Sequence, residues 1–203
     1  MITTLLASSA ILLGGVTVKP TTCPVMGHGD ANASVSTVDF RSTRYSFCCN
    51  GCPTAFAANP DKYLKNPELK GKTIGTFLFD PVSRTAITAG TASASMEYQG
   101  VRYLFGNAAN LAKFKKSPAT YTAMPAKEVL QCPVANEKLN GYAGAYAYQD
   151  VKGVRYFICC PGCVPKFQKE PAKYTAGVAK LISAAKPFTL KAGEVPASEC
   201  VEK

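Results

Sequence analysis

The chain has little of what most enzymes use for catalysis. Its 203 residues include one histidine, and its 13 acidic residues are scattered along the sequence. No Ser-His-Asp set, no phosphate-binding loop and no carboxylate pair placed against the histidine can be recognised. We therefore expect a protein that is not an enzyme.

Long apolar runs and dense basic stripes are also missing. The hydrophobic fraction of 47% and the charged fraction of 18% are ordinary for a globular protein. The net charge of +10 is spread over the whole chain, whereas nucleic-acid binding typically uses a basic stripe with exposed aromatic residues. The sequence predicts no transmembrane segment in the mature chain and argues against a nucleic-acid partner.

Cysteine, in contrast, is abundant and ordered. Eight of the nine cysteines form two matching sets, each opening with Cys-Pro-Val and closing with Cys-Cys-x-Gly-Cys. The two sets are Cys23, Cys48, Cys49 and Cys52, and Cys132, Cys159, Cys160 and Cys163. Few proteins need this arrangement for packing alone, and clustered thiolates are ligands for soft metal ions.

A further copy of the same residue pattern lies between these two sets and has no cysteine. We call this shared pattern the frame. Asp80-Pro81-Val82 replaces Cys-Pro-Val, and Gly106, Asn107 and Asn110 occupy the positions of the cluster cysteines. All three copies, called first, middle and third below, keep a phenylalanine, a proline and a tyrosine downstream. These shared residues are Phe56, Pro60 and Tyr63, then Phe114, Pro118 and Tyr121, then Phe167, Pro171 and Tyr174. The shared positions are expected to serve the fold, and the cysteines are dispensable to it.

The frame resembles the YHS and TRASH families of small metal-associated domains. The resemblance covers residues 23–63, 80–121 and 132–174, and the first and third copies carry the more specific motif. It implies binding, trafficking or sensing of heavy metals. It also implies a fold similar to a treble-clef zinc finger.

We predict an α+β protein of three tandem treble-clef-like modules, each a β-hairpin followed by short helices. Gly100 and Gly153 mark hairpin turns, and each cluster opens a helix that ends before Pro60, Pro118 or Pro171. The expected boundaries are 1–18 for a signal-peptide-like segment, 20–66, 76–124 and 128–177 for the modules, and 178–203 for a tail. Residues 65–76 and 122–129 are interpreted as linkers, and residues 178–185 as a short helix.

The apolar run from Leu5 to Val18 is too short to span a bilayer and is similar to the core of a signal peptide. It predicts an extracytoplasmic protein, periplasmic or secreted. The alternative is a buried N-terminal strand or helix. Cys200 has no partner in the repeats and is interpreted as a single thiol or an intermolecular link.

A helix start favours thiolates, and both Cys48 and Cys49 are spaced to share a face with Cys52. Cys23 would approach from its loop, and Met26 or His28 could add a fourth ligand. The alternatives are a core position for Met26 and an exposed loop position for His28. The third copy has neither residue, so its site would draw on thiolates alone.

The sequence therefore predicts about two sites for copper or zinc ions. Three thiolates suit Cu(I), whereas Zn(II) prefers four ligands. The functional hypothesis is a metal-binding protein for sequestration, trafficking or sensing, with metal ions and a metal-delivery protein as partners. The alternative is a structural or protein-interaction array held by disulfides or structural zinc. A thiol switch between adjacent cysteines is a further alternative.

Overall fold

The computed structural model describes residues 15–31 and 35–192 and confirms the α+β class. A β-hairpin followed by two short helices occurs three times along the chain. The hairpins are β1 (Thr37–Phe40) with β2 (Thr43–Tyr45), β4 (Ala94–Tyr98) with β5 (Val101–Phe105), and β9 (Ala147–Val151) with β10 (Val154–Ile158). The helix pairs are α1 (Cys52–Ala58) with α2 (Pro60–Leu64), α3 (Ala108–Lys116) with α4 (Pro118–Tyr121), and α5 (Cys163–Lys169) with α6 (Pro171–Gly177).

All three hairpins use a two-residue turn with positive φ at both positions. This is the turn that matches the right-handed twist of paired strands. The predicted turns at Gly100 (φ 78°) and Gly153 (φ 76°) are confirmed, and in the first copy Ser42 (φ 59°) takes the place of the glycine. The turn residues are Arg41-Ser42, Gln99-Gly100 and Lys152-Gly153.

Each hairpin also carries the same ion pair between its strands. An arginine on the second strand lies opposite a carboxylate on the first, with nitrogen–oxygen distances of 2.8 Å. The pairs are Arg44–Asp39, Arg102–Glu97 and Arg155–Asp150. Opposite charges at facing positions stabilise a strand pair, so the three hairpins share this contact as well as their turn.

The helices pack on the hairpins through the predicted aromatic residues. Phe56, Phe114 and Phe167 are buried, and each stacks near a strand tyrosine at centroid distances of 4.8, 5.0 and 5.8 Å. A tyrosine from the second helix also packs near each phenylalanine, at centroid distances of 6.2 to 6.4 Å. Aromatic contacts of this kind contribute about 0.5–1.5 kcal/mol each beyond their buried area.

Only the last residues of the segments interpreted as linkers enter the sheets. Strand β3 (Gly75–Phe77) lies between β2 and β5, so the first and middle copies form one six-stranded sheet in the order β12-β1-β2-β3-β5-β4. Strand β6 (Lys127–Val129) pairs with β10 in a sheet ordered β11-β6-β10-β9. A separate pair joins β7 (Gln131–Cys132) and β8 (Glu137–Lys138). Single 3₁₀ turns occur at Pro67–Leu69 and Tyr142–Gly144.

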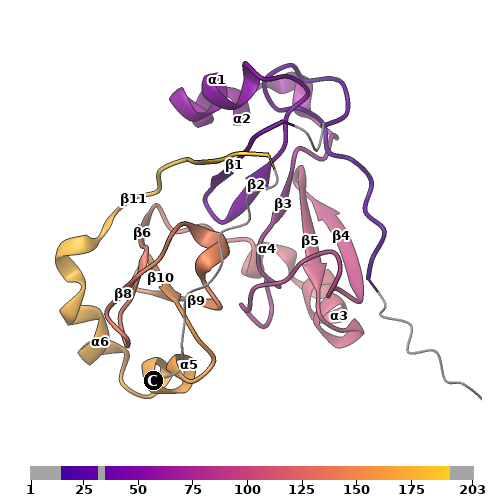
Figure 1. Ribbon diagram of the computed structural model, residues 1–203. Helices are drawn as coiled ribbons and strands as arrows, with labels where there is room; N and C mark the ends of the chain where they lie inside the picture. Colours follow the sequence, from indigo (N-terminus) through magenta and orange to yellow (C-terminus); the bar gives the residue numbers. More distant parts are fainter. Residues whose placement is uncertain (1–14, 32–34, 193–203) are drawn as a thin grey trace, which may run out of the picture.

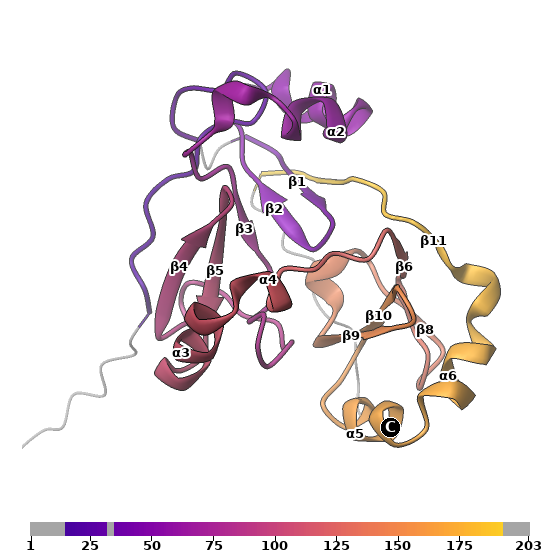
Figure 2. The same cartoon turned by 180° about the vertical axis from the view of Figure 1, so that it is seen from behind.

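The helix expected over residues 178–185 is also wrong. Only Ala179–Leu181 is helical, as a 3₁₀ turn, and β11 (Ser183–Ala184) follows it. The chain then returns to the first copy, where β12 (Phe188–Leu190) pairs with β1. Figures 1 and 2 show this yellow segment crossing the molecule from α6 to β1.

Among the residues that the structure describes, the buried hydrophobic side chains form two cores. One belongs to the first copy, and the other is shared by the middle and third copies. The buried guanidinium of Arg155 connects them, because it donates to Ser42 Oγ in the first hairpin turn at 3.3 Å. Helices α1 and α5, which follow the two cysteine clusters, lie at opposite ends of the molecule (Figures 1 and 2).

Candidate metal centres

Two groups of three thiols converge in the structure. Cys23, Cys48 and Cys52 form the first triad, and Cys132, Cys159 and Cys163 form the third-copy triad. Within each triad the sulfur atoms all lie within 4.8 Å of one another. Five of the six cysteines are buried and Cys48 is partly buried. Each triad could therefore hold one thiophilic metal ion.

The first triad is assembled by a tight loop and a helix start. The N–H of Gly27 donates to the carbonyl of Cys23 at 2.9 Å, and Gly27 has a φ of 69°, which glycine adopts readily. Lys72 Nζ donates to the Gly27 carbonyl at 2.6 Å and holds this loop from outside. Cys52 is the first residue of α1, so its sulfur faces the loop from the helix start.

The third-copy triad also consists of three cysteines, but its first cysteine lies on a strand and not in a loop. Cys132 lies at the end of β7 and is fixed by the pairing of β7 with β8. Cys163 opens α5, and its sulfur lies 3.9 Å from that of Cys159. The sequence left open whether the first or second residue of the adjacent Cys-Cys pair joins the triad. The structure places Cys48 and Cys159 there.

The second residue of each adjacent pair lies outside its triad. Cys49 is exposed and Cys160 is partly buried. The sulfur of Cys49 nevertheless lies 3.0 Å from that of Cys52, and the sulfur of Cys160 lies 2.9 Å from that of Cys163. In the first and third copies, one sulfur is thus shared between the triad and an outer pair.

The electrostatics of the first triad are uneven. Burial raises the pKa of Cys23, but N–H groups of Met26, Cys48 and Val25 direct hydrogen bonds to its sulfur and leave the pKa lowered overall. Burial, followed by contact with neighbouring thiols, raises the pKa values of Cys48 and Cys52. A bound cation must therefore displace protons from the latter two thiols.

The same balance is visible in the third copy. Burial, and then the hydrogen bond with Cys160, raises the pKa of Cys163 to about 12. A metal cation reverses this preference, because coordinated thiols are deprotonated. Metal binding at both triads is consequently coupled to proton release.

The proposed fourth ligands of the first copy lie at exposed positions. His28 is exposed and is not part of the group of mutually close ligand atoms. Met26 is 44% exposed, and its backbone N–H is directed at Cys23. The first and third copies thus each bring three cysteine sulfurs together.

The middle copy replaces the triad by a hydrogen-bond network. Asp80 is 1% exposed. Its Oδ1 accepts from the N–H groups of Val82 (2.9 Å) and Ser83 (3.2 Å), and its Oδ2 accepts from the Gly106 N–H (2.9 Å) and Asn110 Nδ2 (2.8 Å). Val25, Met26 and Cys48 direct N–H groups at Cys23 from the corresponding positions. Sequence reasoning aligned these positions but missed the bonds that replace the thiols.

No disulfide joins the eight cysteines that the structure describes. The sequence alternatives in which Cys23 or Cys132 is bridged to its cluster are therefore not present in this structure. Cys200 and residues 1–14 of the signal-like segment lie outside the described residues, and so do the expectations placed on them.

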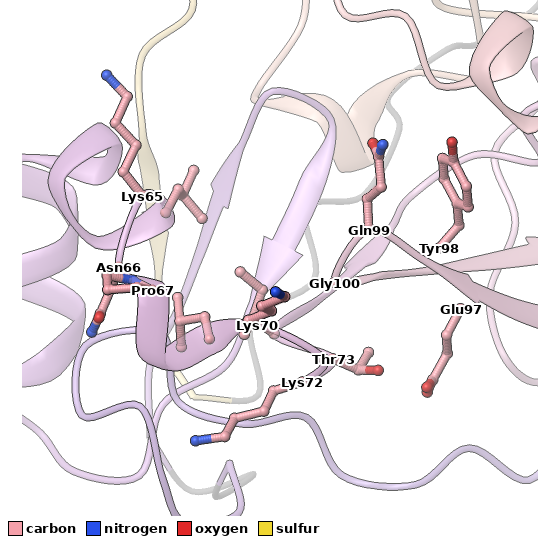
Figure 3. Close-up of a pocket in the computed structure, with 14 residues that line it drawn as sticks. Lys65, Asn66, Pro67, Lys70, Lys72, Thr73, Glu97, Tyr98, Gln99 and Gly100 are labelled. Atoms are coloured by element: carbon pink, nitrogen blue, oxygen red, sulfur yellow. The ribbon is translucent and has the colours of Figure 1, made fainter.

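A pocket of about 480 Å³ lies apart from both triads, and no cysteine lines it. It is formed between the 3₁₀ turn after α2 and the turn of the β4–β5 hairpin (Figure 3). Its wall includes Lys72, which contacts the Cys23 loop, and Glu97, which pairs with Arg102. Lys72 therefore connects the pocket wall to the loop that carries Cys23.

Comparison of the chain with protein families, curated proteins and solved structures finds no match. Within residues 15–31 and 35–192, no helix has the length and apolar character needed to cross a bilayer. Functional inference therefore depends on the two triads themselves.

Proposed function

We propose that this protein is a non-enzymatic metal-binding protein that carries or sequesters a thiophilic metal ion at each of its two cysteine triads. The observation that carries the proposal is the convergence of three buried or partly buried sulfurs in each of two distant places. Clustered thiols have no packing advantage over aliphatic side chains, whereas soft metal ions are bound tightly by thiolates.

Cu(I) is the metal that fits the donor set best. Each triad offers three sulfurs, and His28 does not supplement the first. Thiolate sulfur selects Cu(I) and Zn(II) over hard ions, but Zn(II) is almost always four-coordinate in closed sites. Zn(II) is the second choice, and it would need a further ligand.

We further propose that the three copies are YHS/TRASH-like, treble-clef-like units and that the chain acts outside the cytoplasm with a metal-delivery protein as its partner. The shared hairpin turns, ion pairs and aromatic stacks support the common origin of the copies. The apolar segment before residue 19 supports export.

A structural role for the metal is the second candidate, and the middle copy favours it. There the Asp80 network ties the loop to the helix start at the place where the other copies have thiols. A metal ion in the first and third copies would make the same cross-link. In that case the metal would stabilise the fold and would not be exchanged.

Competition with a chromophoric chelator separates the two roles. The full chain is loaded anaerobically with Cu(I) or, separately, Zn(II), and metal transfer is followed together with far-ultraviolet circular dichroism. A carrier should release about two ions while the spectrum is unchanged. Loss of the spectrum in step with metal release would favour the structural role, and a reduced chain that takes up neither metal would refute both.

A further inference from the structure

We propose that Cys49–Cys52 and Cys160–Cys163 are dithiol pairs that react with low-molecular-weight disulfides, and that the resulting protein disulfide releases metal from the adjoining triad. The dithiol chemistry stands on the geometry of the pairs, and only the metal release rests on the proposed function. The four residues occupy equivalent positions in the first and third copies.

The two sulfurs of each pair are already in contact. Their separations of 3.0 and 2.9 Å exceed the length of an S–S bond, about 2.05 Å, by only about 1 Å. The turn that brings them together is formed by backbone hydrogen bonds from the Cys52 N–H to the Cys49 carbonyl (3.3 Å) and from the Cys163 N–H to the Cys160 carbonyl (3.2 Å). Bond formation therefore needs little movement of the backbone.

The adjacent cysteines differ in access. Cys49 is exposed, whereas Cys52 is buried at the start of α1. An incoming disulfide can thus reach Cys49 first. Cys48 is the neighbour of Cys49 in sequence, yet its sulfur belongs to the triad with Cys23. The structure separates the two adjacent thiols into an inner ligand and an outer reactive group.

The reaction balances as an ordinary thiol–disulfide exchange. The sulfur of Cys49 attacks one sulfur of oxidised glutathione, forms a mixed disulfide and releases one glutathione thiolate. The sulfur of Cys52 then attacks Cys49 and releases the second glutathione. Two electrons pass from the protein pair to glutathione, and the two thiol protons leave with the two glutathione products.

Oxidation would remove one of the three triad sulfurs. Cys52 in a disulfide cannot coordinate as a thiolate, so the first triad keeps only Cys23 and Cys48. Cys163 has the same double role in the third copy. By reciprocity of linked equilibria, a metal ion bound at the triad must oppose formation of the disulfide.

The first arm of the test uses metal-free full-length protein with Cys200→Ser, so that the ninth thiol does not interfere. The protein is incubated with oxidised and reduced glutathione, alkylated and mapped by peptide mass spectrometry. We expect one Cys49–Cys52 and one Cys160–Cys163 disulfide, with Cys23 and Cys132 alkylated. The double variant Cys48→Ser/Cys159→Ser should form the same two disulfides. Disulfides that use Cys48 or Cys159, or only persistent glutathione adducts, would overturn the proposal.

The second arm uses Zn(II)-loaded protein and a chromophoric chelator. Oxidised glutathione should speed Zn(II) release from the Cys200→Ser protein at least tenfold. The speed-up should vanish when Cys49→Ser and Cys160→Ser are added, because these changes remove the thiols that react with oxidised glutathione. Both triads are left intact, so Zn(II) should still bind. Equal release from the two proteins would overturn the coupling. If the chain binds no Zn(II), the same comparison is made with Cu(I)-loaded protein. A chain that binds neither metal would refute the metal function, while the first arm still decides whether the dithiol pairs exist.

Discussion

Replacing Asp80, Gly106 and Asn110 together by cysteine should create a third metal site in the middle copy. These residues occupy the positions of the triad cysteines, and the Asp80 carboxylate already contacts the other two. A Cβ at Gly106 would lie 3.7 Å from Asp80 Oδ2, which is an ordinary contact, so the side chain fits. The backbone at Gly106 does not have a positive φ that would strain a cysteine.

The cost of the change follows from the hydrogen bonds of Asp80. Its carboxylate accepts four, two from the loop and two from residues at the helix start. Bonds to a buried charged group contribute about 1.5–3 kcal/mol each but are not additive, so we expect the metal-free variant to lose about 3–5 kcal/mol in free energy of unfolding. Metal at about 1,000 times its Kd would restore about 4 kcal/mol.

The assay is metal stoichiometry by elemental analysis, combined with thermal unfolding in the presence and absence of metal. The triple-cysteine chain should bind about three ions and be stabilised by them more than the wild-type chain. The matched triple-serine variant should lose stability similarly but still bind about two ions. A folded triple-cysteine chain that binds only two ions would refute the equivalence of the three positions.

Three further results are expected. The pKa values of Cys48 and Cys52 are raised. The apparent Kd of the first triad for metal, measured by competition with a chelator, should therefore rise ~10-fold per pH unit of acidification for each displaced proton. Burial raises the pKa of Glu128 from 4.5 to about 7, so the free energy of unfolding in urea should fall as pH rises between these values, by at most about 3 kcal/mol. Glu128→Gln should abolish that slope, and an unchanged slope would exclude Glu128 as its source. Arg155→Ala should lower the free energy of unfolding by about 3–5 kcal/mol, because it breaks a buried ion pair. Arg41→Ala, which breaks an exposed pair, should lower it by less than about 1 kcal/mol. Equal losses in the two variants would contradict this contrast.

The local structure of each copy was predictable because short-range signals specify it. Gly100 and Gly153 favour the turn geometry that the hairpins adopt. Prolines at positions 60, 118 and 171 separate the paired helices as predicted. Phe56 and its counterparts occupy the expected core positions. The α+β class follows from these elements.

The connections between the copies were not predictable in the same way. Strands β3 and β12 are three residues long, and their partners are distant in the sequence. Such short strands lack a clear alternation of polar and apolar residues, so nothing local distinguishes them from linkers. The acidic residue five positions before each strand arginine is a signal in the sequence that indicates the hairpin ion pair.

The choice between adjacent cysteines also needed three-dimensional information. Cys48 and Cys49 are both close to Cys52 along the chain, and spacing on a helix permits either pair. Helix α1 begins only at Cys52, so the direction of the preceding turn decides which sulfur faces Cys23. The triad takes Cys48 and leaves Cys49 outside.

The most direct test of the two-triad account is the metal content of three fully reduced proteins loaded anaerobically with Cu(I) or Zn(II). The wild-type chain and the Cys49→Ser/Cys160→Ser variant should each retain about two ions after desalting. The Cys48→Ser/Cys159→Ser variant, changed at the neighbouring positions, should retain essentially none. A reduced wild-type chain without metal, or equal loss in the two variants, would contradict the account.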